Sequence, residues 1–224
     1  PRPSEEVRQF TWQMIDRLMQ DGIKMLVIAC NTAAAVVLEE VKEKLPVPVI
    51  GVVRPGAISA LKVTKNNHVA VIGTQGTIRS RAYENALKSI NSRVKIETLA
   101  CPEFVPLVER GIFQGEEAKR VVGSSLQPLL DKPFDTLILG CTHYPLLQDV
   151  IQEVVGKNRT LINSGTETAR EVSSLLYHNN LLYTKERTPK HIFYTTGDRE
   201  TFQKIGSSWL GVELEHVETI RLGS

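Results

Sequence analysis

Long apolar runs are missing from this chain of 224 residues, and so is a strong excess of charge of either sign. The apolar runs, such as residues 25–30, are about as long as a strand and far shorter than the roughly 18 residues that a membrane-spanning helix needs. The 27 basic and 25 acidic residues give a net charge of +2 and are mixed along the chain. We therefore expect neither a membrane nor nucleic acid as a partner.

Cysteine is scarce as well, with three residues and no pair spaced as Cys-x-x-Cys. Such a set does not suit a disulfide framework or a zinc site, and it fits free thiols in a reducing compartment. No signal peptide is visible in the sequence. We therefore expect a cytoplasmic protein that holds no metal.

What the sequence does contain is a regular alternation of helical and strand patterns. Residues 4–21 carry an apolar residue every three to four positions, which predicts an amphipathic helix capped by Ser4. Residues 25–29 are continuously apolar, which predicts a fully buried strand. Further strands are predicted at 49–53, 68–72, 94–99, 136–139, 161–162, 191–195 and 215–220. Further helices are predicted at 32–44, 57–63, 77–90, 115–130, 145–154, 166–177 and 198–209, with a break at 54–56.

This alternation predicts an α/β fold with mainly parallel sheets and helices on both faces of each sheet. One pattern occurs twice: residues 26–32 and 137–143 both have three aliphatic residues, a small residue, Cys, and polar residues that open a helix. The repeat predicts two similar α/β lobes that face each other. Ligands in such folds bind beyond the carboxyl ends of the strands.

Cys30 and Cys141 are the strongest candidates for chemistry, because each stands where a strand ends and a helix begins. The unpaired N–H groups and partial positive charge of a helix N-terminus favour a thiolate, so we expect both thiol pKa values to fall toward neutrality. Asn31, Thr32 and Thr142 add hydrogen-bonding groups at the same places. The alternative is that both cysteines are small apolar residues of the core.

Two opposed thiols suit the inversion of a carbon centre, which needs a proton removed from one face and another delivered to the opposite face. Neither a metal nor an imine-forming lysine is required. His143 could relay protons or stabilise a thiolate, or it could bond its own backbone. Glu109 could orient His143, or it could be an ordinary glutamate at a helix end.

Thr74 and Thr77 follow a predicted strand and flank Gly76, so their hydroxyls could bind an anionic group, although such residues are common in strand–helix turns. Cys101 is followed by Pro102 rather than by a polar helix start. We therefore assign Cys101 to packing.

The two cysteine motifs, residues 29–33 and 140–145, resemble the catalytic motifs of bacterial glutamate racemases, within the wider aspartate/glutamate racemase superfamily. The resemblance covers essentially the whole chain. It extends to residues 49–52, 55–57, 71–74, 106–111 and 164–169.

This resemblance implies two similar three-layer α/β domains with glutamate bound in the cleft between them. We assign residues 1–51 and 163–224 to the first domain and residues 52–162 to the second. Cys30 and Cys141 would be the two catalytic bases, assisted by His143 and Glu109, without a cofactor. Asn31, Thr32, Thr74, Thr77, Thr142 and His143 would bind the substrate. The family supplies D-glutamate for peptidoglycan, and so for the cell wall and cell shape, and commonly forms homodimers.

The start of the chain departs from the family pattern. Family members open with a strand, an Asp-Ser-Gly-x-Gly-Gly motif and a later Tyr-Gly, whereas this sequence begins at Pro1. We therefore expect a sequence that starts downstream of the natural start and a chain that is poorly active on its own.

Three other functions are compatible with the same residues. The substrate could be aspartate or another acidic amino acid, which offers the same α-carboxylate and amine. The chain could be a non-catalytic small-molecule binding protein of the same fold. A cysteine hydrolase needs only one nucleophile and a His base, and it leaves the second matched Cys unexplained.

Overall fold

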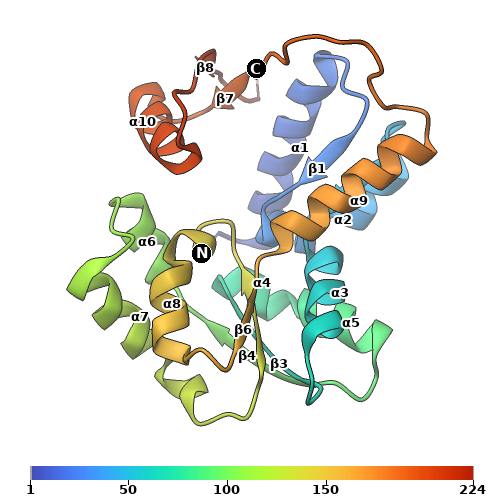
Figure 1. Ribbon diagram of the computed structural model, residues 1–224. Helices are drawn as coiled ribbons and strands as arrows, with labels where there is room; N and C mark the ends of the chain where they lie inside the picture. The colour runs from blue at the N-terminus through green and yellow to red at the C-terminus, as the bar shows by residue number, and fades with distance from the viewer. Residues whose placement is uncertain (1, 224) are drawn as a thin grey trace.

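The computed structural model describes residues 2–223 and has an α/β architecture in which every described strand pair is parallel (Figure 1). The predicted fold class is therefore confirmed. The largest sheet has the strand order β4-β3-β5-β6. Its strands are β3 (His68–Gly73), β4 (Lys95–Ala100), β5 (Thr136–Gly140) and β6 (Thr160–Ile162).

Two smaller sheets have two strands each in the described part of the chain. The first pairs β1 (Leu26–Ile28) with β2 (Val49–Gly51), beside α1 (Ser4–Gln20) and α2 (Asn31–Lys44). The second pairs β7 (Phe193–Thr195) with β8 (Val217–Thr219), beside α10 (Arg199–Leu210). The assignment of residue ranges to two domains stays a prediction.

The four-stranded sheet is covered on both faces, and this explains why its central strands, β3 and β5, are buried at every position and mostly apolar. Side chains of β3 alternate between two cores: Ala70 and Ile72 belong to one, and Val69 and Val71 to the other. The first core is completed by α6 (Phe104–Glu109), α7 (Gly115–Leu130), the 3₁₀ helix η1 (Tyr144–Leu147) and α8 (Gln148–Val155). The second is completed by α3 (Val53–Val63), α5 (Ala82–Ile90) and α2. Helix α9 (Ser164–His178) packs against α3 (Figure 1).

Strand β1 is not fully buried, which corrects the prediction for residues 25–29. Leu26 and Ile28 are buried, but Val27 between them is 40% exposed. One face of β1 packs into the second core while the other face is open within the described residues. A continuous apolar run in the sequence therefore does not distinguish a strand with one buried face from a strand with two buried faces.

Several helix ends also differ from the prediction. The expected break at residues 54–56 lies inside the first turn of α3, where Pro55 is tolerated because backbone N–H groups there have no helical partner. Ser4 lies inside α1, and Pro3 precedes the helix without a side-chain cap. Helix α6 was not predicted as a separate element.

The helix predicted at residues 77–90 is divided in two. Helix α4 (Gln75–Ser80) ends at Arg81, whose φ of 57° is left-handed, and α5 begins at the next residue. The helix predicted at 145–154 likewise starts as η1 before α8. Both breaks lie next to candidate site residues, so they decide where those side chains point.

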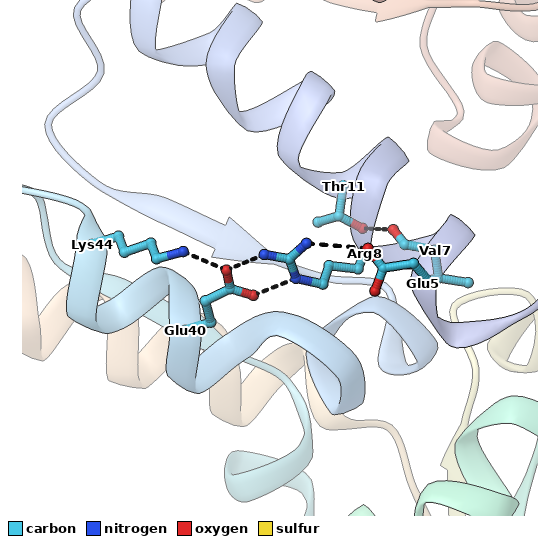
Figure 2. A network of polar contacts seen from close by, with 6 residues as sticks. All are labelled: Glu5, Val7, Arg8, Thr11, Glu40 and Lys44. Carbon is cyan, nitrogen blue, oxygen red and sulfur yellow. Dashed lines mark hydrogen bonds and ion pairs between the residues drawn. The ribbon is translucent and has the colours of Figure 1, made fainter.

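Helix α1 is fastened to α2 by an ionic cluster around Glu40 (Figure 2). Nε of Arg8 donates to Oε2 of Glu40 at 2.7 Å, and Nζ of Lys44 donates to Oε1 at 2.6 Å. The Arg8 hydrogen bonds, followed by that of Lys44, lower the pKa of Glu40 to about 2. The Glu40 carboxylate therefore stays ionised, and its ion pairs with Arg8 and Lys44 persist, over the ordinary pH range.

Among residues 2–223, no helix is long and apolar enough to cross a bilayer.

Candidate active site

Cys30 and Cys141 both stand just beyond the carboxyl end of a parallel strand. Cys30 precedes α2 in an extended conformation, and its carbonyl accepts from the N–H of Ala34 at 2.8 Å. Cys141 follows β5 directly, but the chain turns before the short helix η1 begins at Tyr144. Cys30 is exposed, whereas Cys141 is buried with 8% of its surface accessible. The two motifs therefore match in sequence but hold their sulfurs in different surroundings.

The surroundings of Cys141 oppose ionisation, which corrects the expectation that its pKa falls. Burial raises the pKa of the Cys141 thiol, and this effect outweighs the backbone N–H groups of His143 and Tyr144, which lower it. The hydroxyl of Thr142 also acts in the lowering direction. A negative charge on Cys30 would raise the pKa of Cys141 further.

His143 and Glu109 form a chain that leads to the second sulfur. Nδ1 of His143 lies 3.8 Å from Sγ of Cys141, and Nε2 lies 3.6 Å from Oε1 of Glu109. Glu109 ends α6 and is mostly exposed, while His143 is half-buried. One imidazole thus contacts the thiol with one nitrogen and the carboxylate with the other, which suits proton transfer or the fixing of a tautomer.

Three threonines, Thr32, Thr74 and Thr77, form a triangle of hydroxyls near the first motif. The Oγ1 atoms of Thr32 and Thr74 are 2.8 Å apart, and each lies 3.1 Å from that of Thr77. Oγ1 of Thr74 also caps α4 by accepting from the N–H of Thr77. Gly76 is needed here, because a Cβ at that position would lie 2.9 Å from Cγ2 of Thr32.

Thr32 and Thr74 line a pocket of about 510 Å³, a size suited to a small ligand. Its other lining residues are Arg2, Val7, Gln75, Gly76, Cys101, Pro102, Val105 and Pro106. The pocket lies where α1, α2 and the loops after β3 and β4 meet. Thr32 follows Cys30 by two residues in the first turn of α2, so the pocket lies near the first motif, although neither Cys30 nor Cys141 is among its lining residues.

Asn31 is buried beside Cys30, and its partner was not predicted. Asn31 is 4% exposed, and its Oδ1 accepts a hydrogen bond from the hydroxyl of Tyr83 at 2.7 Å. Tyr83 lies in the second position of α5 and is buried. The sequence offered no signal for this contact, because the left-handed turn at Arg81 that aims Tyr83 here was not visible.

Cys101 lies in the core, as its assignment to packing implies. It has no exposed surface, and burial raises the pKa of its thiol to about 12. Its carbonyl accepts from the hydroxyl of Tyr144 at 2.9 Å. Cys101 is therefore a neutral thiol at ordinary pH.

The family model "Asp/Glu/Hydantoin racemase" matches residues 2–172 of the chain. The chain is 57% identical over 222 residues to the glutamate racemase of Bacillus cereus, covering 99% of this chain and 82% of that protein. It is 55% identical over 224 residues to the glutamate racemase of Enterococcus faecalis, covering 100% and 82% respectively.

Solved structures of similar proteins have the same arrangement. Glutamate racemase isoform RacE1 from Bacillus anthracis superposes with a TM-score of 0.95 and 43% identity, covering 99% of this chain and 82% of that one. The glutamate racemase of Francisella tularensis, in complex with D-glutamate, gives a TM-score of 0.91 and 30% identity, covering 98% and 82%. The similarity therefore extends from the sequence to the arrangement of the site-bearing strands and helices.

Proposed function

Because the chain belongs to the Asp/Glu/hydantoin racemase family, we propose that it interconverts L- and D-glutamate with Cys30 and Cys141 as two opposed acid/base thiols. The chain is an isomerase, since relatives between 51% and 57% identical over nearly its whole length are glutamate racemases. The observation that carries the mechanism is the placement of the two cysteines at corresponding strand ends.

In the proposed reaction, the thiolate of one cysteine removes the α-proton of glutamate and becomes a thiol. The electron pair of the broken C–H bond stays on the α-carbon, beside the carboxylate. The thiol of the other cysteine then delivers its proton to the opposite face of that carbon and becomes a thiolate. The reverse reaction exchanges the two roles, so no cofactor is consumed or needed.

Burial gives Cys141 the role of the protonated partner in the resting protein. Its raised pKa keeps the Cys141 thiol neutral until this thiol gives its proton to the α-carbon of the substrate. The thiolate that then forms is favoured by the Thr142 hydroxyl and by the backbone N–H groups of His143 and Tyr144, which all lower the pKa of Cys141. His143, with Glu109 behind it, lies where it can stabilise that thiolate or pass a proton to it.

The polar groups around Cys30 are the proposed substrate contacts. The hydroxyls of Thr32, Thr74 and Thr77 and the amide of Asn31 can bond the carboxylates and the amine of glutamate. Thr142 and His143 would complete the contacts from the second motif.

Proton exchange in deuterated water tests the function directly. L-glutamate and D-glutamate are incubated separately with the full-length protein, and NMR follows loss of the α-proton signal, with L- and D-aspartate run in parallel. We expect exchange of both glutamate enantiomers and loss of racemisation by at least a thousandfold in Cys30→Ser and Cys141→Ser.

Each other function has its own result in this experiment. Faster exchange of aspartate than of glutamate would replace the substrate while keeping the mechanism. Binding of glutamate without any exchange, and with affinity unchanged by either Cys→Ser substitution, would show a binding protein instead of an enzyme.

The biological setting is proposed on the same basis. The product would be D-glutamate for peptidoglycan. The protein would act in the cytoplasm, where thiols stay reduced, and it would work as a homodimer. Sedimentation of the purified protein checks the last point, since a monomer at all concentrations contradicts it.

A further inference from the structure

We infer that Tyr83 is a positioning residue that fixes the amide of Asn31 as a hydrogen-bond donor and joins the first cysteine motif to the second. The inference rests on the proposed function, because it assigns Tyr83 a part in holding glutamate. Tyr83 does not line the threonine pocket and touches no reacting atom in the proposed mechanism. It acts through residues that neighbour the two sulfurs.

The hydroxyl of Tyr83 determines what Asn31 can offer to a ligand. An asparagine amide has one oxygen acceptor and two N–H donors. Because Oδ1 accepts from Tyr83 at 2.7 Å, the group that Asn31 can present to a substrate is Nδ2 with its two hydrogens. A donor in this position selects an acceptor such as a carboxylate oxygen and rejects a protonated amine.

The ring of Tyr83 contacts the strand that carries the second sulfur. A Cβ added to Gly140, the residue before Cys141, would lie 3.1 Å from Cε2 of Tyr83. A Cβ added to Gly56 of α3 would lie 3.3 Å from Cε1. The ring therefore packs in the space that two glycines leave open, with Gly140 on one edge and Gly56 on the other.

Tyr83 also lies close to a third segment. A Cβ added to Gly56 would lie 3.3 Å from the Tyr83 oxygen and 3.0 Å from Cβ of Ser164, the first residue of α9, so both side chains border the space beside this glycine. Burial raises the pKa of Tyr83 above its usual value, so the hydroxyl keeps the proton that it donates to Asn31. One neutral side chain thus contacts α2 and the end of β5 and lies close to the start of α9.

The left-handed turn at Arg81 is what places the ring there. Arg81 has φ of 57°, which ends α4 just after Thr77 and restarts the chain as α5 in a new direction. The short segment 74–83 thereby supplies two hydroxyls to the threonine triangle and one hydroxyl to Asn31. Thr77 and Tyr83 are six residues apart and would face different sides of a continuous helix. Such a helix could therefore not place Thr77 in the threonine triangle and Tyr83 against Asn31 at the same time.

A double-mutant cycle tests the coupling between Tyr83 and Asn31. Tyr83→Phe removes only the hydroxyl, and we expect it to lower kcat/KM for glutamate about tenfold, mainly through KM. In an Asn31→Ala background the same change should cost less than about twofold, because its partner is gone. Melting temperatures of all variants report whether each one is folded.

Tyr144→Phe is the matched control. It also removes a buried hydroxyl that donates one hydrogen bond, at 2.9 Å, but to the carbonyl of Cys101. Its effect on kcat/KM should be the same factor in the wild-type and Asn31→Ala backgrounds. Equal cost of Tyr83→Phe in both backgrounds, or no cost in the wild type, would overturn the inference.

Asn31→Asp gives a second test that does not depend on the folding of Tyr83→Phe. The carboxylate can still accept from the Tyr83 hydroxyl, but it has no donor for a substrate. We expect glutamate affinity to fall at least tenfold while the melting temperature stays within a few degrees. Unchanged affinity would overturn the inference. Failure of the wild-type protein to exchange the α-proton of glutamate would instead overturn the proposed function, and this inference with it.

Discussion

The three sulfurs of this chain have three different environments, although all belong to free thiols. Cys30 is exposed at the start of a helix, Cys141 is buried among polar groups, and Cys101 is enclosed in the apolar core. Reactivity requires both access and a means of stabilising negative charge. Of the three, Cys30 has the access, and Cys141 has the hydrogen-bond partners around its sulfur.

Alkylation should separate the sulfurs in this order. With iodoacetamide at pH 8, Cys30 should react first, Cys141 more slowly, and Cys101 more than about tenfold more slowly than Cys30, because its sulfur meets no solvent. Mass spectrometry of proteolytic fragments over time measures each rate. If Cys30, like the other two cysteines, were labelled only after denaturant is added, this would contradict its exposed position.

Cys101 should also make the folded state sensitive to alkali. Its pKa rises from 9.0 to about 12 on folding, so the unfolded chain loses this proton first as the pH increases. The stabilisation that the buried Cys101 thiol contributes to the free energy of unfolding is constant below pH 9. Above pH 9 it falls by about 1.4 kcal/mol per pH unit, until the pH passes the folded pKa.

Urea unfolding of the wild type and of Cys101→Ala between pH 8 and pH 10.5 measures this slope. The difference between the two proteins isolates the thiol from the lysines and tyrosines that titrate in the same range. Parallel stability curves across that range would contradict the buried, neutral thiol.

At the scale of the elements, the two cysteine motifs differ in the segment that comes after the sulfur. The first enters the long helix α2 at once, while the second passes through the short helix η1 before α8. Gly140 approaches the neighbouring strand so closely that an added Cβ would lie 2.7 Å from the carbonyl oxygen of Ile72. The place of the second sulfur therefore depends on a glycine, whereas the first motif has Ala29 at the corresponding position.

Gly140→Ala should therefore be costly. The methyl group would meet backbone on one side and the Tyr83 ring on the other, so we expect a loss of about 2–4 kcal/mol of stability and a displaced Cys141. Gly123→Ala in α7 is the control, since its Cβ would meet nothing within 4 Å and should stabilise by about 0.5–1 kcal/mol. Chemical denaturation and racemisation of both variants provide the comparison, and equal stability of the two would contradict the close approach.

Because of the ionic cluster between α1 and α2, the stability that these two helices gain from packing together should depend on pH. Arg8→Gln should lower the melting temperature at pH 7 by a few degrees, since it removes the main partner of Glu40. The folded pKa of Glu40 is lowered from 4.5 to about 2, so the stabilisation is complete above pH 4.5 and is lost as the pH falls toward 2. Thermal melts from pH 7 to pH 3 should show the two proteins converging, and a constant gap would contradict this origin.

The sequence was most informative where periodicity and end signals agreed. Helix α7 has the predicted bounds, and β3 and β5 lie within one residue of theirs, because both faces of these strands are buried and favour a continuous apolar run. The turn at Arg81 was missed because left-handed conformations are uncommon for residues other than glycine. Pro55 was read as a break because its position in a first turn depends on where the helix starts.

The candidate site was predictable from the sequence to the extent that its residues follow strand ends. The structure brings His143 next to both Cys141 and Glu109, and Thr32 next to Thr74 and Thr77. The raised pKa of Cys141 was not predictable, because it depends on how deeply β5 is covered. Tyr83 was missed because a contact between positions 31 and 83 leaves no local pattern.

For the molecule as a whole, the site is assembled from segments that are distant in sequence. The first motif belongs to the β1–β2 sheet, and the second to the four-stranded sheet. Helices α3 and α9 pack between them, with Nζ of Lys62 bonded to Oε1 of Glu167 at 3.0 Å. A ligand that contacts both motifs therefore adds a connection between two parts of the fold.

Glutamate should accordingly stabilise the protein. At a concentration 100 times its dissociation constant, a ligand that binds only the folded state adds about 2.7 kcal/mol, which is a rise of several degrees in melting temperature. Cys30→Ser should retain most of this shift, because the hydroxyl and amide contacts remain. Scanning calorimetry with glutamate, and with glutarate as an amine-free control, measures the effect, and no shift for glutamate would contradict the proposed site.

The unequal burial of Cys30 and Cys141 has a consequence for a reaction whose substrate and product are mirror images. L- and D-glutamate have equal free energies in water, so their equilibrium is fixed at an even mixture and kcat/KM must be identical for both enantiomers. The separate values of kcat and KM are not fixed in this way. An exposed sulfur and a covered one let the protein hold one enantiomer more tightly and turn it over more slowly than the other. In the proposed two-thiol mechanism, the difference between the exposed Cys30 and the buried Cys141 would therefore govern how fast each enantiomer is processed at saturation, while the final ratio stays the same.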